Sequence, residues 1–279
     1  MGNKVAFITG ASRGIGAESA VALAKAGYRV AITARTLSEG ERHDYVGRST
    51  ELPGSLEATA AAVQRAGGEV LCLRGDILEP QSMVAAAQAA LQHFGRIDVL
   101  FNNAVYQGAG NLESILDVAE DQLRAIYQGN VFTPLALVQT ILPAMIEQGS
   151  GTILNMVSHS AFTNPPAAGD QGGWGFAYPS SKAALARMAG SLRAEHPGAG
   201  LRVFNLEPGL VMTEVMRLAG IDEAVMARYK PCSPAAIAAV VSWLADNEPW
   251  PDWEPEDVLH GPAIAKELDL LQLPSLLDT

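Results

Sequence analysis

Short apolar runs rich in β-branched residues alternate with alanine-rich segments along most of this 279-residue chain, and no other feature limits the fold as strongly. Six runs are predicted as strands, over residues 5–9, 29–33, 69–73, 97–101, 152–156 and 201–206. Five segments between them are predicted as helices, over residues 14–26, 55–66, 80–94, 117–147 and 178–195. Such alternation is typical of a parallel sheet with helices on both faces. We therefore predict an α/β fold, a doubly wound parallel sheet of the Rossmann type, in one domain over residues 1–279.

Three segments interrupt this pattern. Residues 36–55 are polar and non-periodic, and residues 162–175 are rich in glycine and proline, so both are predicted as insertions. The C-terminal segment 246–279 is atypical, because residues 246–257 contain six acidic residues, three prolines and two tryptophans. We expect an extended surface segment there.

Composition narrows the class of protein. Hydrophobic residues make up 48% and charged residues 18% of the chain, which is typical of a soluble protein with a large core. The net charge of −11 argues against binding to nucleic-acid backbones. Cys72 and Cys232 lack the spacing of a disulfide framework or a zinc site, so no metal is expected. The first predicted strand leaves no room for a signal peptide, and the apolar run 131–146 is too short for a membrane span, so we expect a cytoplasmic enzyme.

The first predicted strand ends in TGASRGIG, residues 9–16, and a predicted helix follows. Its three glycines, Gly10, Gly14 and Gly16, would let backbone N–H groups and the helix N-terminus approach a pyrophosphate. The position after the first strand of an alternating fold is the context that a dinucleotide site requires. The alternative is a tight turn without a ligand.

The end of the second predicted strand indicates which dinucleotide is bound. NAD-binding folds usually have an acidic residue there, which holds the ribose hydroxyls. Here Ala34 is followed by Arg35, and Arg13 lies within the glycine turn. Guanidinium groups form strong, often bidentate hydrogen bonds to phosphate. We therefore predict NADP(H), with NAD(H) as the less favoured cofactor.

The stretch FAYPSSKAAL, residues 176–185, places Tyr178 and Lys182 four positions apart. Pro179 favours the first turn of a helix, so the helix is expected to begin here. Positions i and i+4 share one face of a helix, so the phenol and the ammonium can project into one space. The alternative is a half-buried tyrosine beside a surface lysine.

Four motifs occur in order between residues 9 and 213: TGASRGIG, NNAV at 102–105, YPSSK at 178–182 and LEPGLVMT at 206–213. Because it contains these four motifs in this order, the chain resembles the short-chain dehydrogenase/reductase family. The resemblance implies a catalytic tetrad of Ser158, Tyr178, Lys182 and Asn130. It also implies that Asp76 meets the adenine, Asn102 the ribose and Thr213 the carboxamide. The full predicted cofactor set is Gly10, Ser12, Arg13, Gly14, Ile15, Gly16, Arg35, Asp76, Ile77, Asn102, Ala104, Lys182, Pro208, Gly209, Val211 and Thr213.

The chemistry of carbonyl reduction gives these residues roles. Tyr178 can supply the proton if its pKa falls from about 10 toward neutrality, a shift of about 4 kcal/mol. An exposed ion pair contributes at most about 1 kcal/mol, so Lys182 must act in a cleft that excludes water. Ser158 would donate a hydrogen bond to the substrate oxygen. The resemblance alone implies that Asn130 holds a relay water. Ser160 is a fallback for Ser158, and His159 is an alternative base.

The chain also departs from the family's pattern. Val105 replaces the glycine that usually follows NNA, and the family's usual final strand is missing unless residues 257–264 are a degenerate version. The predicted helices 117–147 and 178–195 are apolar enough to pair in a homodimer or homotetramer. The alternative is that both are simply buried against the sheet.

The predicted substrate wall is apolar, which favours a hydrophobic carbonyl compound or secondary alcohol. We therefore predict an NADP(H)-dependent carbonyl reductase or alcohol dehydrogenase. A 3-hydroxyacyl-thioester dehydrogenase and a dinucleotide-sensing protein without turnover remain as alternatives. The wall residues are Phe162, Trp174, Phe176, Met212 and Met216.

Overall fold

The computed structural model of this chain describes residues 4–45, 48–218, 231–248 and 258–270. Within these ranges, seven parallel strands form one sheet in the order β5-β2-β1-β6-β7-β8-β9. The α/β doubly wound prediction is therefore confirmed. The strands are β1 (Val5–Thr9), β2 (Arg29–Ala34), β5 (Val70–Arg74), β6 (Val99–Asn102), β7 (Gly151–Met156), β8 (Leu201–Glu207) and β9 (Val258–His260).

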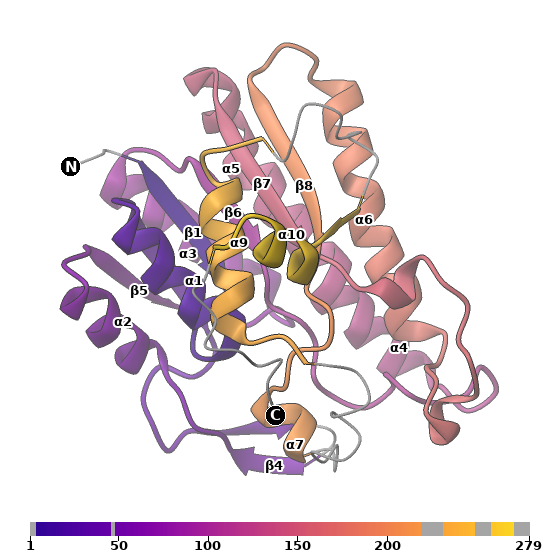
Figure 1. Cartoon of the computed structure of the whole chain (residues 1–279). Helices are drawn as coiled ribbons and strands as arrows, with labels where there is room; N and C mark the ends of the chain where they lie inside the picture. Colours follow the sequence, from indigo (N-terminus) through magenta and orange to yellow (C-terminus); the bar gives the residue numbers. More distant parts are fainter. Residues whose placement is uncertain (1–3, 46–47, 219–230, 249–257, 271–279) are drawn as a thin grey trace.

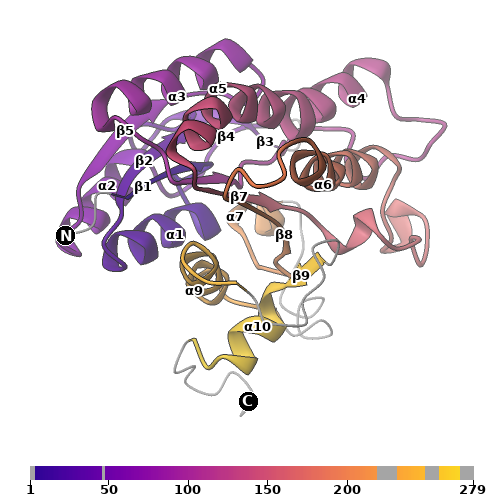
Figure 2. The same cartoon turned by 90° about the horizontal axis from the view of Figure 1, so that it is seen from above.

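Helices cover both faces of this sheet, as Figures 1 and 2 show. Helices α1, α2, α9 and α10 enclose one apolar core, and α3, α5 and α6 enclose the other. Because both faces are buried, β1 and β7 are buried along their whole length. The helices are α1 (Gly14–Lys25), α2 (Leu56–Arg65), α3 (Pro80–Phe94), α4 (Glu120–Tyr127), α5 (Thr133–Gln148), α6 (Ala177–Glu195), α7 (Glu214–Leu218), α9 (Pro234–Leu244) and α10 (Gly261–Glu267).

The predicted helix 117–147 is interrupted in the structure. Helix α4 passes into a π-helical turn, Gln128–Phe132, before α5 begins. Pro134 has no N–H to donate to the carbonyl of Asn130, four residues earlier, which accounts for the change of winding at this point. The run 120–148 is long and apolar enough to cross a membrane by composition, but 44% of its most apolar window is buried inside the protein.

Two segments differ from their predicted description. The insertion 36–55 contains an antiparallel hairpin of β3 (Arg42–Tyr45) and β4 (Arg48–Glu51). The sequence did not predict it, because these residues are mostly polar and show no alternation of apolar and polar side chains. The segment 257–264 supplies β9, which pairs with β8 so that Leu259 lies opposite Leu206. A degenerate final strand is therefore present.

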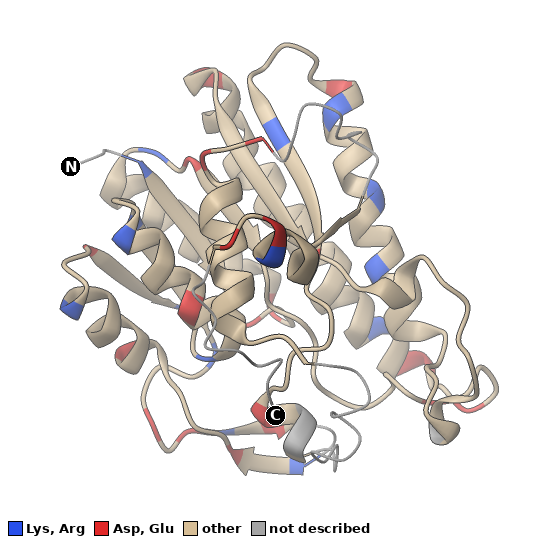
Figure 3. Ribbon diagram, viewed as in Figure 1, with Lys and Arg blue, Asp and Glu red and all other residues tan. Residues whose placement is uncertain are grey.

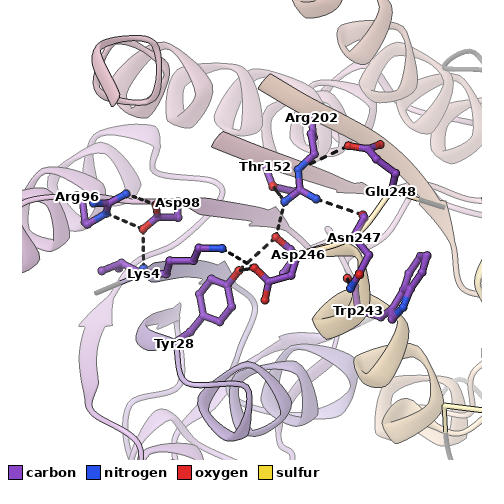
Figure 4. Close-up of polar contacts among 12 residues, drawn as sticks. Lys4, Tyr28, Arg96, Asp98, Thr152, Arg202, Trp243, Asp246, Asn247 and Glu248 are labelled. Atoms are coloured by element: carbon purple, nitrogen blue, oxygen red, sulfur yellow. Dashed lines mark hydrogen bonds and ion pairs between the residues drawn. The ribbon is translucent and has the colours of Figure 1, made fainter. Parts of the chain in front are cut away.

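A polar network joins the amino ends of the strands to the segment after α9 (Figure 4). The Tyr28 hydroxyl donates to Asp246 Oδ1 at 2.8 Å, and Lys4 Nζ lies 2.6 Å from the same oxygen. Burial and the Asp246 carboxylate raise the pKa of Tyr28. Burial also raises the pKa of Asp246, but hydrogen bonds from Lys4 and Tyr28 outweigh it and the net shift is downward. The start of the predicted surface segment 246–257 is thus bonded to the sheet's amino end through Asp246. Residues 249–257 lie outside the described ranges.

Candidate active site

The motifs found in the sequence meet at the carboxyl edge of the sheet. From β1 the strand order runs through β2 and β5 in one direction and through β6 to β9 in the other. In doubly wound sheets such a reversal opens a crevice beyond the carboxyl ends of the strands, where ligands bind. The glycine turn follows β1, NNAV begins at the end of β6, Ser158 follows β7, and LEPGLVMT begins at the end of β8.

The glycine turn has the geometry that a pyrophosphate requires. A Cβ at Gly10 would lie 2.9 Å from Ala104 Cα, and one at Gly16 would lie 2.3 Å from the Gly10 carbonyl oxygen. These two positions therefore exclude side chains. Gly14 instead has φ +56°, and a Cβ there would meet no heavy atom within 4 Å. The N-terminus of α1 thus faces open space and has no side-chain cap, so these residues fit the phosphates of a dinucleotide.

Two residues that the sequence analysis did not single out fix this turn in place. Asn103 Nδ2 donates to the carbonyl oxygen of Thr9 at 2.8 Å. The Thr9 hydroxyl accepts from the N–H groups of Asn103 and Ala104 at 3.0 and 2.9 Å. The signal lay in the two motifs themselves, since Thr9 opens one and Asn103 belongs to the other.

A ladder of asparagines crosses three neighbouring strands beneath the crevice. Asn102, Asn155 and Asn205 are in register on β6, β7 and β8. Asn102 Nδ2 donates to Asn155 Oδ1 at 2.9 Å, and Asn205 Nδ2 donates to the Ala186 carbonyl oxygen on α6 at 3.0 Å. Asn102 Oδ1 is buried without a hydrogen-bond partner among the described residues. An unpaired buried acceptor is costly, so a bound ligand with a donor group would stabilise it.

Tyr178 and Lys182 lie in the first turns of α6, which begins at Ala177 as Pro179 predicted. Lys182 is only 2% exposed, so it is not a surface lysine. Its Nζ donates to the Met156 carbonyl oxygen at 2.8 Å and lies 5.9 Å from the centre of the Tyr178 ring. Burial lowers the pKa of Lys182 to about 7.

The pKa of Tyr178 shifts upward in this structure, opposite to the expected direction. Burial is the main cause, and the nearby Glu207 carboxylate adds to it. A hydrogen bond with Ser158 works in the other direction but does not offset burial. Burial therefore favours the protonated phenol, and Lys182 is not among the groups that shift its pKa.

Ser158 lies two residues after the end of β7, and its side chain reaches Tyr178. Its Oγ is hydrogen-bonded to Tyr178 and lies 3.0 Å from Ser160 Oγ. Both serines are partly buried, whereas His159 is exposed. The fallback residue Ser160 is thus adjacent to the predicted one.

Asn130 is fully buried in the π-helical turn. Its Nδ2 donates to Ser181 Oγ at 3.0 Å, and its Oδ1 accepts from the Tyr106 N–H at 2.9 Å. The side chain therefore holds the segment after β6 against α6. A water-holding role for Asn130 stays a prediction.

The two arginines predicted to bind a 2′-phosphate have different surroundings. Arg13 donates to five acceptors of the protein, all of them within the insertion 36–55. Arg35 makes no hydrogen bond or ion pair with any described residue and stacks on Tyr45, with 5.3 Å between its guanidinium carbon and the ring centre. Nearby, Asp76 accepts from the Leu78 N–H, and the Ile77 carbonyl oxygen accepts from Thr133.

The segment after β8 is held by an acid that the sequence analysis did not name. Glu207 is 6% exposed, and its Oε1 accepts from the Gly209 N–H at 2.8 Å. Gly209 has φ +66°, so the chain turns sharply after Pro208. Val211 is buried and pairs with Cys232, and Thr213 directly precedes α7. Ser12, Ile15 and Ala104 lie around the glycine turn.

A groove of about 810 Å³ lies beside the serines. Its walls are the segments 112–117 and 160–176, and the first turns of α6 complete it. Trp174 and Phe176 line it, whereas Phe162 is 49% exposed and is not part of the lining. Met212 is partly buried outside the lining, and the side chain of Met216 lies outside the described part of the structure.

Comparison with known proteins agrees with these features. The short chain dehydrogenase family model matches residues 4–224. An uncharacterized oxidoreductase of Methylorubrum extorquens is 32% identical over 253 residues, covering 88% of this chain and 91% of the relative. A ketoacyl reductase of Nostoc is 30% identical over 242 residues, covering 85% and 75% of the two chains.

Solved structures show the same architecture. A metagenomic short-chain oxidoreductase in complex with NADP is 28% identical, with a TM-score of 0.70 and coverage of 93% of this chain and 98% of that one. A 7α-hydroxysteroid dehydrogenase complexed with NADH and 7-oxo glycochenodeoxycholic acid is 26% identical, with a TM-score of 0.75 and 92% coverage of both chains. The family match spans most of the chain and the sheet order agrees with it, so this protein belongs to the short-chain dehydrogenase/reductase family of oxidoreductases.

Proposed function

We propose that this oxidoreductase uses NADP(H) to interconvert an apolar carbonyl compound and its secondary alcohol. The observation that carries the proposal is the grouping of Ser158, Tyr178 and the buried Lys182 at the edge of the sheet where the glycine turn also lies. A protein that only sensed a dinucleotide would have no use for this group.

Each side chain has a role in carbonyl reduction. When bound, a reduced nicotinamide would supply the hydride that reaches the carbonyl carbon. Tyr178 gives its proton to the carbonyl oxygen, and Ser158 donates a hydrogen bond that stabilises negative charge on that oxygen. The raised pKa of Tyr178 suits this direction, because the protonated phenol is the form that donates. Lys182, held by the Met156 carbonyl oxygen, keeps its ammonium beside the phenol and strengthens the acid once protonated.

The preference for NADP(H) rests on the end of β2. At Ala34 there is no carboxylate that would repel a 2′-phosphate. Arg35 stacks on Tyr45 but has no hydrogen-bond or ion-pair partner among the described residues, so its N–H groups can bind phosphate. The complex of a 28% identical relative with NADP supports this assignment. The complex of another relative with NADH shows that the family uses both dinucleotides.

An uncharged apolar substrate fits the groove best. Ser160 links the groove to Ser158, and apolar side chains line both walls. The charged side chains along the described lining, Glu113 and Asp117, are acidic. They would repel the phosphates of a coenzyme A thioester. The steroid bound by one relative supports a bulky apolar ketone, whereas the Nostoc ketoacyl reductase favours the acyl-thioester alternative.

A screen of NADPH oxidation tests this proposal. We expect turnover with apolar cyclic and aromatic ketones, little with acyl thioesters, and at least tenfold less with NADH than with NADPH. Glu113→Gln with Asp117→Asn should raise thioester turnover without changing ketone turnover, because only the charged substrate senses these carboxylates. Dinucleotide binding without oxidation of NADPH by any of these compounds would instead support the sensing alternative.

We also propose that the chain forms a homodimer or homotetramer and acts in the cytoplasm. Support for association comes from exposed apolar side chains at the start of and along α5. Phe132, at the end of the π-helical turn, is 52% exposed, and Leu135 and Ile146 of α5 are each 39% exposed. Leu135→Glu is expected to shift sedimentation toward the monomer, whereas Gln64→Glu, at an exposed position of α2 on the other side of the sheet, is the control for charge alone. A monomeric parent protein would contradict this proposal. The free Cys72 and Cys232 fit a reducing compartment.

Nucleic acid is not among the proposed partners. In the view of Figure 3, basic residues lie on several helices and strands, and acidic residues lie among them. The net charge of −11 would repel a phosphate backbone.

A further inference from the structure

The hairpin β3–β4 lies close to segments that follow four different strands of the sheet. Tyr45, at the end of β3, is 3% exposed and packs with Leu52 and with Val215 of α7. The Asp44 carboxylate, next to it, contributes to the raised pKa of Tyr106, after the burial of that phenol. Arg13 and Arg35 contact the Tyr45 ring from the segments after β1 and β2. In Figure 1 the hairpin lies beside α7 at the bottom of the molecule.

Arg13 holds one end of this hairpin. Its Nη1 donates to the Tyr45 hydroxyl at 2.7 Å, and its Nε donates to the Pro53 carbonyl oxygen at 2.9 Å. Its Nη2 donates to the Gly54 carbonyl oxygen at 2.9 Å, to the Leu52 carbonyl oxygen at 3.3 Å and to Thr36 Oγ1 at 3.2 Å. All three guanidinium nitrogens are therefore bound to the protein. Most of its donor capacity is used in this way, and only the second N–H of Nη1 has no acceptor among these contacts.

The backbone around Gly54 shows how closely the insertion 36–55 packs against the glycine turn. Gly54 has φ +98°, and a Cβ there would lie 2.6 Å from the Ser12 carbonyl oxygen and 2.9 Å from Arg13 Cβ. The insertion thus packs directly on the glycine turn. At its other side, Tyr45 and Leu52 pack on Val215, which follows the motif that ends in Thr213.

We propose that the β3–β4 hairpin bridges the two ends of the dinucleotide crevice, and that Arg13 is the positioning residue that holds it there. The 2′-phosphate is then held chiefly by Arg35. The hairpin slows release of NADPH and NADH alike, whereas Arg35 distinguishes them by binding the 2′-phosphate that only NADPH carries. This inference rests on the proposed dinucleotide site but not on the identity of the carbonyl substrate.

Binding measurements without a carbonyl substrate separate these two roles. Fluorescence titration and stopped-flow dissociation would be measured with NADPH and with NADH for the parent protein, Arg13→Ala, Arg35→Ala and the control Arg42→Ala. Arg42 is an exposed hairpin residue whose guanidinium bonds only within the hairpin among the described contacts. Arg13→Ala is expected to speed dissociation of both dinucleotides about tenfold and by equal factors. Arg35→Ala should weaken NADPH about 10- to 100-fold and leave NADH unchanged, because it removes a charge-assisted bond to phosphate.

Hydrogen exchange of the free protein provides an independent readout. Arg13→Ala should increase amide exchange of residues 42–45 and 48–54, and Arg35→Ala should not. If Arg13→Ala fails to fold, Tyr45→Ala tests the same contact from the hairpin side and should also speed release of both dinucleotides. Weaker binding of NADPH alone in Arg13→Ala would overturn the inference, and so would unchanged hairpin exchange. Absence of NADPH oxidation by the parent protein would contradict the proposed function but leave these binding and exchange tests intact.

Discussion

Tyr178→Phe is expected to lower kcat for ketone reduction by a factor of about 10² to 10⁴, the usual contribution of a positioned general acid. The substitution removes one oxygen and keeps the ring that packs in the first turn of α6. Dinucleotide affinity should stay within about twofold of the parent value, because the phenol acts on the substrate oxygen. Single-turnover oxidation of NADPH is the appropriate measurement, since it isolates the chemical step from product release.

Tyr127→Phe is a matched control for this experiment. Tyr127 lies at the end of α4, where its ring contacts Phe132, and it is outside the group of Ser158, Tyr178 and Lys182. Activity should be unchanged in this variant. Near-full reductase activity in Tyr178→Phe would remove the phenol from the mechanism and leave Ser158 or a water as the proton source.

Residues close together in the chain were the most predictable part of the site. The spacing of Tyr178 and Lys182 on one helical turn fixes their common face, and the glycine turn needs only its position after β1. The sheet was predictable for a related reason, because apolar runs buried on both faces have few alternatives to central parallel strands.

Features that depend on tertiary contacts were harder to predict. The asparagine ladder of Asn102, Asn155 and Asn205 depends on strand register, which the sequence of any one strand does not specify. Arg13 was predicted as a phosphate ligand because its neighbours in sequence are glycines, whereas its partners in space come from an insertion 23 to 41 residues further along the chain. The direction of the Tyr178 pKa shift depends on how much water burial removes, and burial was not visible in the sequence.

Lys182→Met is expected to change how the stability of the free protein depends on pH. Burial lowers the pKa of Lys182 to about 7 in the folded chain, while the unfolded chain keeps an ordinary value near 10.5. Below pH 7 Lys182 is protonated in both the folded and the unfolded chain. Its contribution to the free energy of unfolding therefore does not change with pH there. Between pH 7 and 10.5 the unfolded chain binds more protons than the folded one, so stability rises with pH. Above pH 10.5 Lys182 is neutral in both the folded and the unfolded chain, so folding no longer has to bury its charge.

The size of this effect follows from the linkage relation. One pKa unit corresponds to about 1.4 kcal/mol, so between pH 7 and 9 the parent protein should gain roughly 2 to 3 kcal/mol relative to Lys182→Met. Urea unfolding at several pH values measures this difference, and the comparison cancels groups that titrate in both proteins. Lys25→Met, which removes an exposed lysine, is the control for the loss of a lysine side chain.

The outcome also decides how Lys182 can serve Tyr178. A parallel pH dependence in the parent protein and Lys182→Met would mean that the ammonium stays charged throughout, held by the Met156 carbonyl oxygen. Lys182 would then be a permanent cation beside the phenol. A difference that grows from pH 7 upward would mean that the free protein holds a neutral amine at alkaline pH. Activity assisted by the ammonium should then fall over the same range, and the pH profile of kcat/KM with a ketone should show a fall that Lys182→Met lacks.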